Sequence, residues 1–260
     1  MNLNYTDQGK GNSIVLIHGF TESLTIWNKF SEALSKKYRV ISIDLPGHGK
    51  SKCIGEVHLM EGMADAIDSV IKMLQIDSFM MVGHSMGGYV SLSYAEKYPE
   101  KVKGLCLFHS QAAADSPEVK VNRARTIEIV KQNHFDFINQ FIPDLFAPSN
   151  RQRLHTEIET LKTEARSFLT KESIIASIEG MRQRKDKCDF LSKINIPVLF
   201  IAGKLDSRIS IAKVTEQLAL PKHAEALFLN IGHMGYLEAP KETLKTIDFF
   251  TDKVFNLKVL

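Results

Sequence analysis

Short apolar runs that alternate with longer amphipathic segments constrain the fold of this chain more than any other feature. The runs are continuous rather than alternating in polarity, and we interpret them as strands over 14–17, 39–43, 79–82, 102–108, 197–202 and 226–230. Such strands are buried on both faces, which is typical of a parallel sheet covered by helices. Helical spacing or amphipathic character predicts helices over 23–37, 58–74 and 86–97. We therefore predict an α/β fold with a mostly parallel, doubly wound sheet.

Residues 111–189 break this alternation because they contain no clear strand. Helices are predicted there over 117–132, 135–141, 150–168 and 171–183. An all-helical insertion of about eighty residues is too long for a plain crossover between two strands. We predict that residues 1–110 and 190–260 form one core domain and that residues 111–189 form a helical cap over one end of its sheet.

The charge balance excludes some partners. The chain has 260 residues, 33 Lys and Arg against 30 Asp and Glu, and a net charge of +3. This even balance does not favour nucleic acid or an anionic membrane as a partner. The densest basic stretch, residues 182–187, is interpreted as a solvated helix end. No feature indicates the oligomeric state.

The chain start and the cysteines indicate compartment and metal content. The first residues lack a basic stretch followed by an apolar core, and no apolar run approaches the ~20 residues that span a bilayer, so we expect a cytoplasmic protein. Cys53, Cys106 and Cys188 are far apart and have no metal-ligand spacing. We therefore expect no disulfide framework and no metal site, and we place Cys106 in the core.

Ser85 lies in the sequence VGHSMGG, residues 82–88, between a predicted strand and a predicted helix. A sharp strand-to-helix turn strains the backbone at its centre and crowds the residues two before and two after, so Gly83 and Gly87 would relieve a clash. The helix that follows also favours negative charge at its start. This is the nucleophile-elbow pattern, and it predicts that Ser85 is a nucleophile with its hydroxyl exposed.

A serine needs a base, and a base needs a carboxylate that orients it. Asp206 and His233 each follow a predicted parallel strand, at the sheet edge where Ser85 also lies. The order Ser85, Asp206, His233 is the one expected for this architecture. Singly, Asp206 is explained as a cap of a helix over 207–220 and His233 as a loop histidine; together we predict that they serve Ser85.

Another grouping uses Asp44 and His48. A tight turn joins these two residues, which fixes them to each other, so we interpret them as structural. His84, next to the predicted nucleophile, should point away from its hydroxyl. A developing oxyanion needs two backbone N–H donors, and the candidates are Phe20 and Met86.

The chain resembles the α/β-hydrolase superfamily over nearly its whole length. The motifs that carry the resemblance are IVLIHGF (14–20), DLPGHGKS (44–51), GHSMGG (83–88), AGKLD (202–206) and GHMGYLEAP (232–240). The resemblance implies a helical cap, Ser85 as nucleophile, His233 as base, Asp206 as its orienter, and an oxyanion hole at Phe20 and Met86. The sequence departs from the family in its short amino terminus, where we expect the first one or two antiparallel strands of fuller members to be absent.

Residue choices separate the relatives within this superfamily. Haloalkane dehalogenases and epoxide hydrolases place aspartate at the elbow, so Ser85 argues against both. Lyases of the menaquinone pathway typically carry arginine where Tyr89 stands, which weakens that assignment. Carbon–carbon-bond hydrolases and cofactor-free haloperoxidases remain open.

These observations favour a serine hydrolase that cleaves an ester, lactone or thioester of a small to medium acyl group without a cofactor. The alternatives are a carbon–carbon hydrolase or lyase that uses the same residues, and a ligand receptor with slow turnover. The aromatic-rich stretch at residues 135–146 could line an acyl pocket, although such residues more often form a cap's own core. His109 and Ser110 leave a strand near the site without an assigned role.

Overall fold

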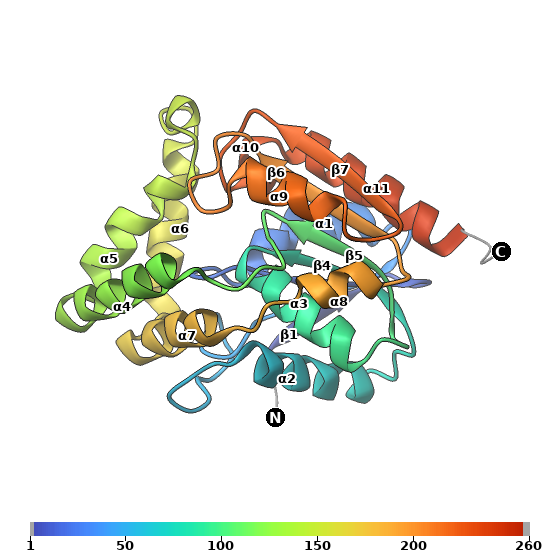
Figure 1. Ribbon diagram of the computed structural model, residues 1–260, viewed down its shortest axis with the longest axis horizontal. Coiled ribbons are helices and arrows are strands. Elements are labelled where there is room, and N and C mark those ends of the chain that lie inside the picture. Colours follow the sequence, from blue (N-terminus) through green and yellow to red (C-terminus); the bar gives the residue numbers. More distant parts are fainter. Residues whose placement is uncertain (1–2, 257–260) are drawn as a thin grey trace.

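The computed structural model describes residues 3–256, and a seven-stranded sheet forms its centre (Figure 1). The strands run in the order β1-β3-β2-β4-β5-β6-β7 across the sheet. Their bounds are Tyr5–Gln8 (β1), Ser13–Ile17 (β2), Arg39–Ile43 (β3), Phe79–His84 (β4), Val102–Phe108 (β5), Val198–Gly203 (β6) and Ala224–Leu229 (β7). All neighbouring pairs are parallel except β1 with β3. The predicted α/β fold is confirmed.

Strand β1 has no counterpart among the predicted strands. It pairs antiparallel with β3, with Tyr5 opposite Ile43, at the edge of the sheet. Its sequence, YTDQ, is half-buried at the first two positions and exposed at the last two. An edge strand with one solvated side needs no apolar run. One antiparallel strand therefore precedes the parallel strands.

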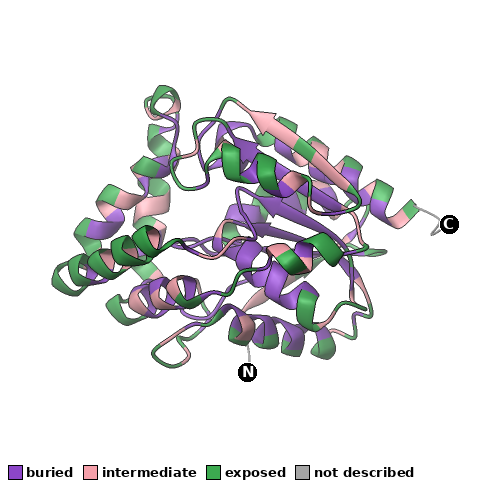
Figure 2. Cartoon of the chain, in the orientation of Figure 1, coloured by how far each residue is buried: buried purple, intermediate pink, exposed green. Residues whose placement is uncertain are grey.

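Complete burial explains why the central strands are apolar throughout. Every residue of β2, β4 and β6 is buried, and Lys103 is the one exposed residue of β5. Figure 2 shows these strands in purple beneath their helices, whereas the edge strand β7 is mostly intermediate. The sheet thus forms the centre of the core and is covered on both faces.

Helices cover both faces of this sheet (Figure 1). The first is preceded by a 3₁₀ turn, Leu24–Trp27, so the helix predicted over 23–37 is divided in two. The helices outside residues 111–189 are α1 (Asn28–Leu34), α2 (Met60–Met73), α3 (Met86–Lys97), α9 (Ile211–Leu218), α10 (Gly235–Glu238) and α11 (Pro240–Asn256). Within residues 3–256, no helix is long and apolar enough to cross a membrane.

The segment between β5 and β6 is helical, as expected. Its helices are α4 (Pro117–Gln132), α5 (His134–Phe141), α6 (His155–Phe168), α7 (Lys171–Gln183) and α8 (Cys188–Lys193). Helix α6 begins five residues later than predicted, after a 3₁₀ turn over Pro148–Asn150. Helices α4 to α7 gather at one end of the sheet, on the left of Figure 1. The division into core and cap domains stays a prediction.

The prediction that residues 182–187 form a solvated helix end is wrong for two of its cations. Arg184 and Lys187 are buried. Arg184 Nη1 lies 2.6 Å from an Asp115 oxygen, and Lys187 Nζ lies 2.5 Å from Glu96 Oε2. A buried cation is tolerated when a carboxylate pairs with it.

We predict opposite effects for alanine at two helical glycines. At Gly180 in α7, a Cβ would lie 1.8 Å from the His58 carbonyl oxygen, whereas at Gly62 in α2 it would meet nothing within 4 Å. The His58 N–H also donates to Ala176 O at 3.0 Å, so α7 cannot withdraw freely. Gly180→Ala should lower the free energy of unfolding by about 2 kcal/mol or more, and Gly62→Ala should raise it by about 0.5–1 kcal/mol. Urea denaturation of both variants measures this, and equal effects would contradict the close approach.

Candidate active site

Ser85 lies at the junction between β4 and α3 in a strained conformation. Its φ of 52° and ψ of −116° are outside the regions that most residues adopt. A Cβ at Gly83 would lie 2.4 Å from the Gly87 carbonyl oxygen, which confirms the expected crowding across the turn. Gly87 is required for a different reason, because its Cβ would lie 2.5 Å from Ile17 O in β2. The turn therefore packs directly against the neighbouring strand.

The structure brings the three predicted residues Ser85, His233 and Asp206 into one chain of hydrogen bonds. His233 Nε2 lies 2.8 Å from Ser85 Oγ, and His233 Nδ1 lies 2.8 Å from Asp206 Oδ2. An ionised carboxylate only accepts, so Nδ1 carries the proton and Nε2 accepts the serine hydroxyl. His233 is itself held through its backbone N–H, which donates to Leu145 O at 2.7 Å.

The Asp206 carboxylate receives four N–H donors. Oδ1 accepts from the backbone N–H groups of Arg208 and Ile209, at 2.7 and 3.0 Å. Oδ2 accepts from the rings of His233 and His109. Burial tends to raise the pKa of Asp206, but the two rings outweigh burial and hold that pKa well below its usual range. Asp206 does not cap α9, because Ser210 fills that role.

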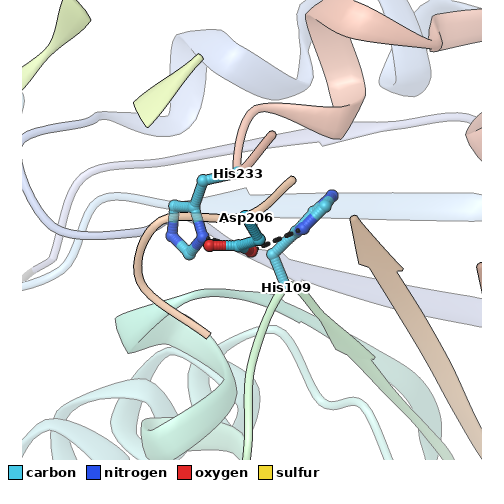
Figure 3. Close-up of side chains that lie close together, drawn as sticks. All are labelled: His109, Asp206 and His233. Carbon is cyan, nitrogen blue, oxygen red and sulfur yellow. Dashed lines mark hydrogen bonds and ion pairs between the residues drawn. The ribbon is translucent and has the colours of Figure 1, made fainter. Parts of the chain in front are cut away.

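His109, whose role the sequence does not indicate, is the second histidine that contacts Asp206 (Figure 3). It follows β5 with a left-handed φ of 49°, and its Nδ1 donates to Asp206 Oδ2 at 3.0 Å. Burial lowers the pKa of His109 to about 4, so the ring is neutral near pH 7. Its Nε2 faces no hydrogen-bond partner in residues 3–256. A position directly after a strand that lies between β4 and β6 was the available signal.

His109, Asp206 and His233 also resemble a metal-binding set, since their potential ligand atoms lie within 4.8 Å of one another. Both Nδ1 atoms, however, direct their protons to Asp206 Oδ2. A metal ion would need lone pairs at those nitrogens. The arrangement fits a hydrogen-bonded network better than a metal centre.

His84 points away from the Ser85 hydroxyl, as expected. Its Nδ1 lies 2.9 Å from Glu22 Oε2, and its Nε2 lies 2.9 Å from the His233 carbonyl oxygen. Burial tends to lower the pKa of His84, but the Glu22 carboxylate outweighs it and the net shift is upward. Both nitrogens face oxygen acceptors and act as donors, and Tyr236 donates to the other Glu22 oxygen at 3.1 Å. This buried ion pair fixes the His233 backbone.

The predicted oxyanion donors are the backbone N–H groups of Phe20, which follows β2, and of Met86, which begins α3. Gly19 O accepts from His18 Nδ1 at 2.7 Å, and Gly19 N–H donates to Glu22 at 2.6 Å. Because a trans peptide places N–H opposite to C=O, these bonds fix the direction of the Phe20 N–H. That N–H has no acceptor within the described chain. Met86 begins α3, so its N–H also lacks an intrahelical partner.

The rejected grouping of Asp44 and His48 has structural contacts. Asp44 accepts from Leu24 N–H at 2.7 Å and from Lys50 N–H at 2.9 Å. His48 Nδ1 lies 3.0 Å from Pro46 O. Neither residue forms a hydrogen bond with Ser85 in the described part of the chain.

A cavity of about 350 Å³ opens above Ser85 and His233. Of the aromatic-rich stretch, Phe137, Phe141 and Leu145 line this cavity, whereas Phe135 is exposed. The stretch therefore contributes to the cavity wall as well as to the core. Charged side chains from the far side complete the wall.

Comparisons with known proteins identify the family to which this fold belongs. A family model described as the alpha/beta hydrolase fold matches residues 12–240. The chain is 30% identical over 248 residues to the (E)-2-((N-methylformamido)methylene)succinate hydrolase of Acinetobacter baylyi, covering 92% of this chain and 89% of that protein. It is 26% identical to the pimeloyl-acyl-carrier-protein methyl ester esterase of Vibrio vulnificus, covering 96% and 98%. A solved thermophilic esterase from Thermogutta terrifontis, with malate bound, superimposes with a TM-score of 0.92 at 31% identity, covering 97% of this chain and 93% of that one.

The lowered pKa of His109 predicts a loss of stability in acid. Between pH 6.5 and 4 the unfolded chain binds a proton at this histidine that the folded chain does not, so the free energy of unfolding falls as the pH falls. The loss should reach roughly 3 kcal/mol at pH 4. His109→Asn keeps a donor toward Asp206, tolerates the left-handed φ and does not titrate.

The measurement is urea denaturation of both proteins from pH 7 to pH 4. Their difference removes the contributions of other buried histidines such as His58. The wild-type protein should lose roughly 3 kcal/mol more than His109→Asn over this range. His155→Asn, at an exposed position, is the matched control. Parallel curves for the wild type and His109→Asn would refute the assignment.

Proposed function

Because this chain belongs to the α/β-hydrolase family, we propose that it hydrolyses a carboxylic ester, lactone or thioester of a small to medium acyl group through an acyl-enzyme on Ser85. The observation that carries the proposal is the unbroken chain from Ser85 Oγ through His233 to Asp206, with both links at 2.8 Å. A serine hydroxyl with a base in hydrogen-bond reach, and that base held by a carboxylate, has the geometry of an activated nucleophile.

In the first half of the reaction, His233 Nε2 takes the hydroxyl proton as Ser85 Oγ attacks the carbonyl carbon. The proton then goes to the leaving group, and the acyl-enzyme remains. In the second half, His233 takes a proton from water as the water oxygen attacks the acyl carbon. The bond from that carbon to Ser85 Oγ then breaks, His233 returns the proton to Oγ, and the carboxylic acid leaves. Asp206 keeps the proton of the resting ring on Nδ1 and stabilises the imidazolium that forms in each half.

The tetrahedral intermediates place negative charge on the former carbonyl oxygen. In the proposed reaction, the N–H groups of Phe20 and Met86 donate to this oxygen. Neither N–H has an acceptor within residues 3–256, and Met86 also begins α3, whose amino end favours negative charge. Their directions are fixed before the substrate binds, so little reorganisation accompanies the charge.

A second candidate is hydrolysis or elimination at a bond other than an ester. It is favoured by the relative from Acinetobacter baylyi, which is named for a substituted succinate rather than for an ester. The same Ser85, His233 and Asp206 would serve such a reaction. A carbon–carbon hydrolase or lyase would use the same three residues. A panel of ring-cleavage products and p-nitrophenyl esters, each assayed with the same enzyme, separates these activities. A receptor with slow turnover would bind ligand in the cavity and release at most about one product per chain.

Removal of the proposed nucleophile should abolish turnover of p-nitrophenyl esters of increasing acyl length. Ser85→Ala should lower kcat on the order of 10⁴- to 10⁶-fold, and Asp206→Asn should lower it roughly 10⁴-fold because the favoured tautomer of His233 is lost. Steady-state kinetics measure both. Ser69→Ala, at an exposed position of α2, is the matched control and should keep wild-type turnover. Activity that persists in Ser85→Ala rules out the covalent mechanism.

A further inference from the structure

The wall of the cavity above Ser85 contains a cation that forms no ion pair within residues 3–256. Arg123 and Arg208 are the two arginines in its wall. Arg123 is paired with Asp115. The Arg208 guanidinium has no hydrogen bond or ion pair with any group in residues 3–256, although its backbone N–H is bonded to Asp206. Lys213, also in the wall, likewise lacks an ion pair within the described residues.

From this imbalance we propose that the substrate carries a free carboxylate in addition to its scissile ester, and that Arg208 binds this carboxylate with Lys213 nearby. The inference rests on the proposed function, because it names the substrate class for the same cavity. An ester of a dicarboxylic acid and an ester of a hydroxy acid both present this chemistry. Guanidinium matches a carboxylate with two parallel N–H donors, which adds direction as well as charge.

The acidic groups around the cavity already have partners. Asp115 is shared by Arg123 and Arg184, and Glu22 is paired with His84. Both carboxylates therefore have their charges compensated within the protein. Positive charge remains at Arg208 and Lys213, so the cavity attracts an anion.

The acidic groups that act on Arg208 do not form an ion pair with its guanidinium. Asp144 attracts its charge, but Asp144 is paired with Arg151 at 3.1 Å. Asp206 attracts it as well, although both Asp206 oxygens accept from other N–H groups. Arg208 is exposed toward the cavity, yet the protein packed around it lowers the pKa of its guanidinium by desolvation. A partly desolvated cation gains most from an anion that arrives with the substrate.

The Arg208 guanidinium packs on an aromatic ring that contacts Phe20. Arg208 Cζ lies 4.6 Å from the centre of the Phe141 ring, and that ring lies 5.5 Å from the Phe20 ring. Phe20 supplies one proposed oxyanion donor, so a single aromatic ring links the guanidinium to the oxyanion site. Arg208 and Ser85 line the same cavity, so a ligand that spans it can place its ester at Ser85 and its carboxylate at Arg208.

Isosteric substrate pairs test the charge alone. Monomethyl glutarate carries its carboxylate on the acyl side, and methyl 5-amino-5-oxopentanoate is its neutral amide. The pair 4-acetoxybutanoate and 4-acetoxybutanamide places the same difference on the alcohol side. The quantity measured is the ratio of kcat/KM for the acid to kcat/KM for the amide. We expect a ratio of about 10 or more in at least one pair.

Three variants locate the source of the preference. Arg208→Gln should lower the ratio about 10-fold or more, toward 1, and Arg208→Lys should restore part of it, since the charge stays but the paired donors are lost. Arg125→Gln makes the same charge change outside the cavity and should keep the wild-type ratio. The ratio should also fall with added salt, because screening weakens the attraction. If Arg208 only packs on Phe141, Arg208→Gln leaves the ratio unchanged and the inference is overturned.

A binding measurement separates this inference from the proposed function. Calorimetric titration of glutarate into Ser85→Ala and into Ser85→Ala/Arg208→Gln requires no turnover. If Arg208→Gln abolishes glutarate binding while the wild type hydrolyses none of the esters, the carboxylate site is supported and the proposed ester hydrolysis is refuted. If the wild type hydrolyses acid and amide at equal rates and glutarate does not bind, the proposed ester hydrolysis is supported and the carboxylate site is refuted.

Discussion

The Asp206 carboxylate is the point on which the rest of the site depends. Loops that follow three adjacent strands meet there: the ring of His109 after β5, two backbone N–H groups after β6, and the ring of His233 after β7. Taking a carboxylate out of water costs several kcal/mol unless donors replace the water. Four N–H donors do so here, and in the same contacts they fix the ring that meets Ser85. The same contacts therefore stabilise the Asp206 carboxylate and orient the His233 ring.

Much of this fold could be predicted because its strands are buried on both faces. The predicted bounds of β3, α3 and β5 agree with the structure, and the carboxyl ends of parallel strands place Ser85, Asp206 and His233 at one edge. Strand β1 could not be predicted in this way, since an edge strand needs few apolar residues. His109 escaped for another reason: the direction of its ring depends on a left-handed backbone and on Asp206, far along the chain.

The state of each charge was also outside the reach of sequence patterns. A run of basic residues looks the same whether its members face water or carboxylates. Residues 182–187 divide between the two, because Arg184 and Lys187 meet Asp115 and Glu96 whereas Lys185 remains exposed. The buried pair of Glu22 and His84 is a second example of an ion pair that sequence patterns do not reveal. Which ions are compensated is decided by tertiary contacts between residues distant in sequence.

Asp206 and Arg208 are two residues apart, and the backbone N–H of the second donates to the carboxylate of the first. A loop of this kind limits how the protein can diversify. Exchange of the whole segment for that of a homologue would disturb the orientation of His233 along with the charge at the cavity. Replacement of the Arg208 side chain alone leaves that N–H in place. Ligand preference can therefore change here by point substitution. An insertion or deletion within the loop would also move the N–H group that holds Asp206.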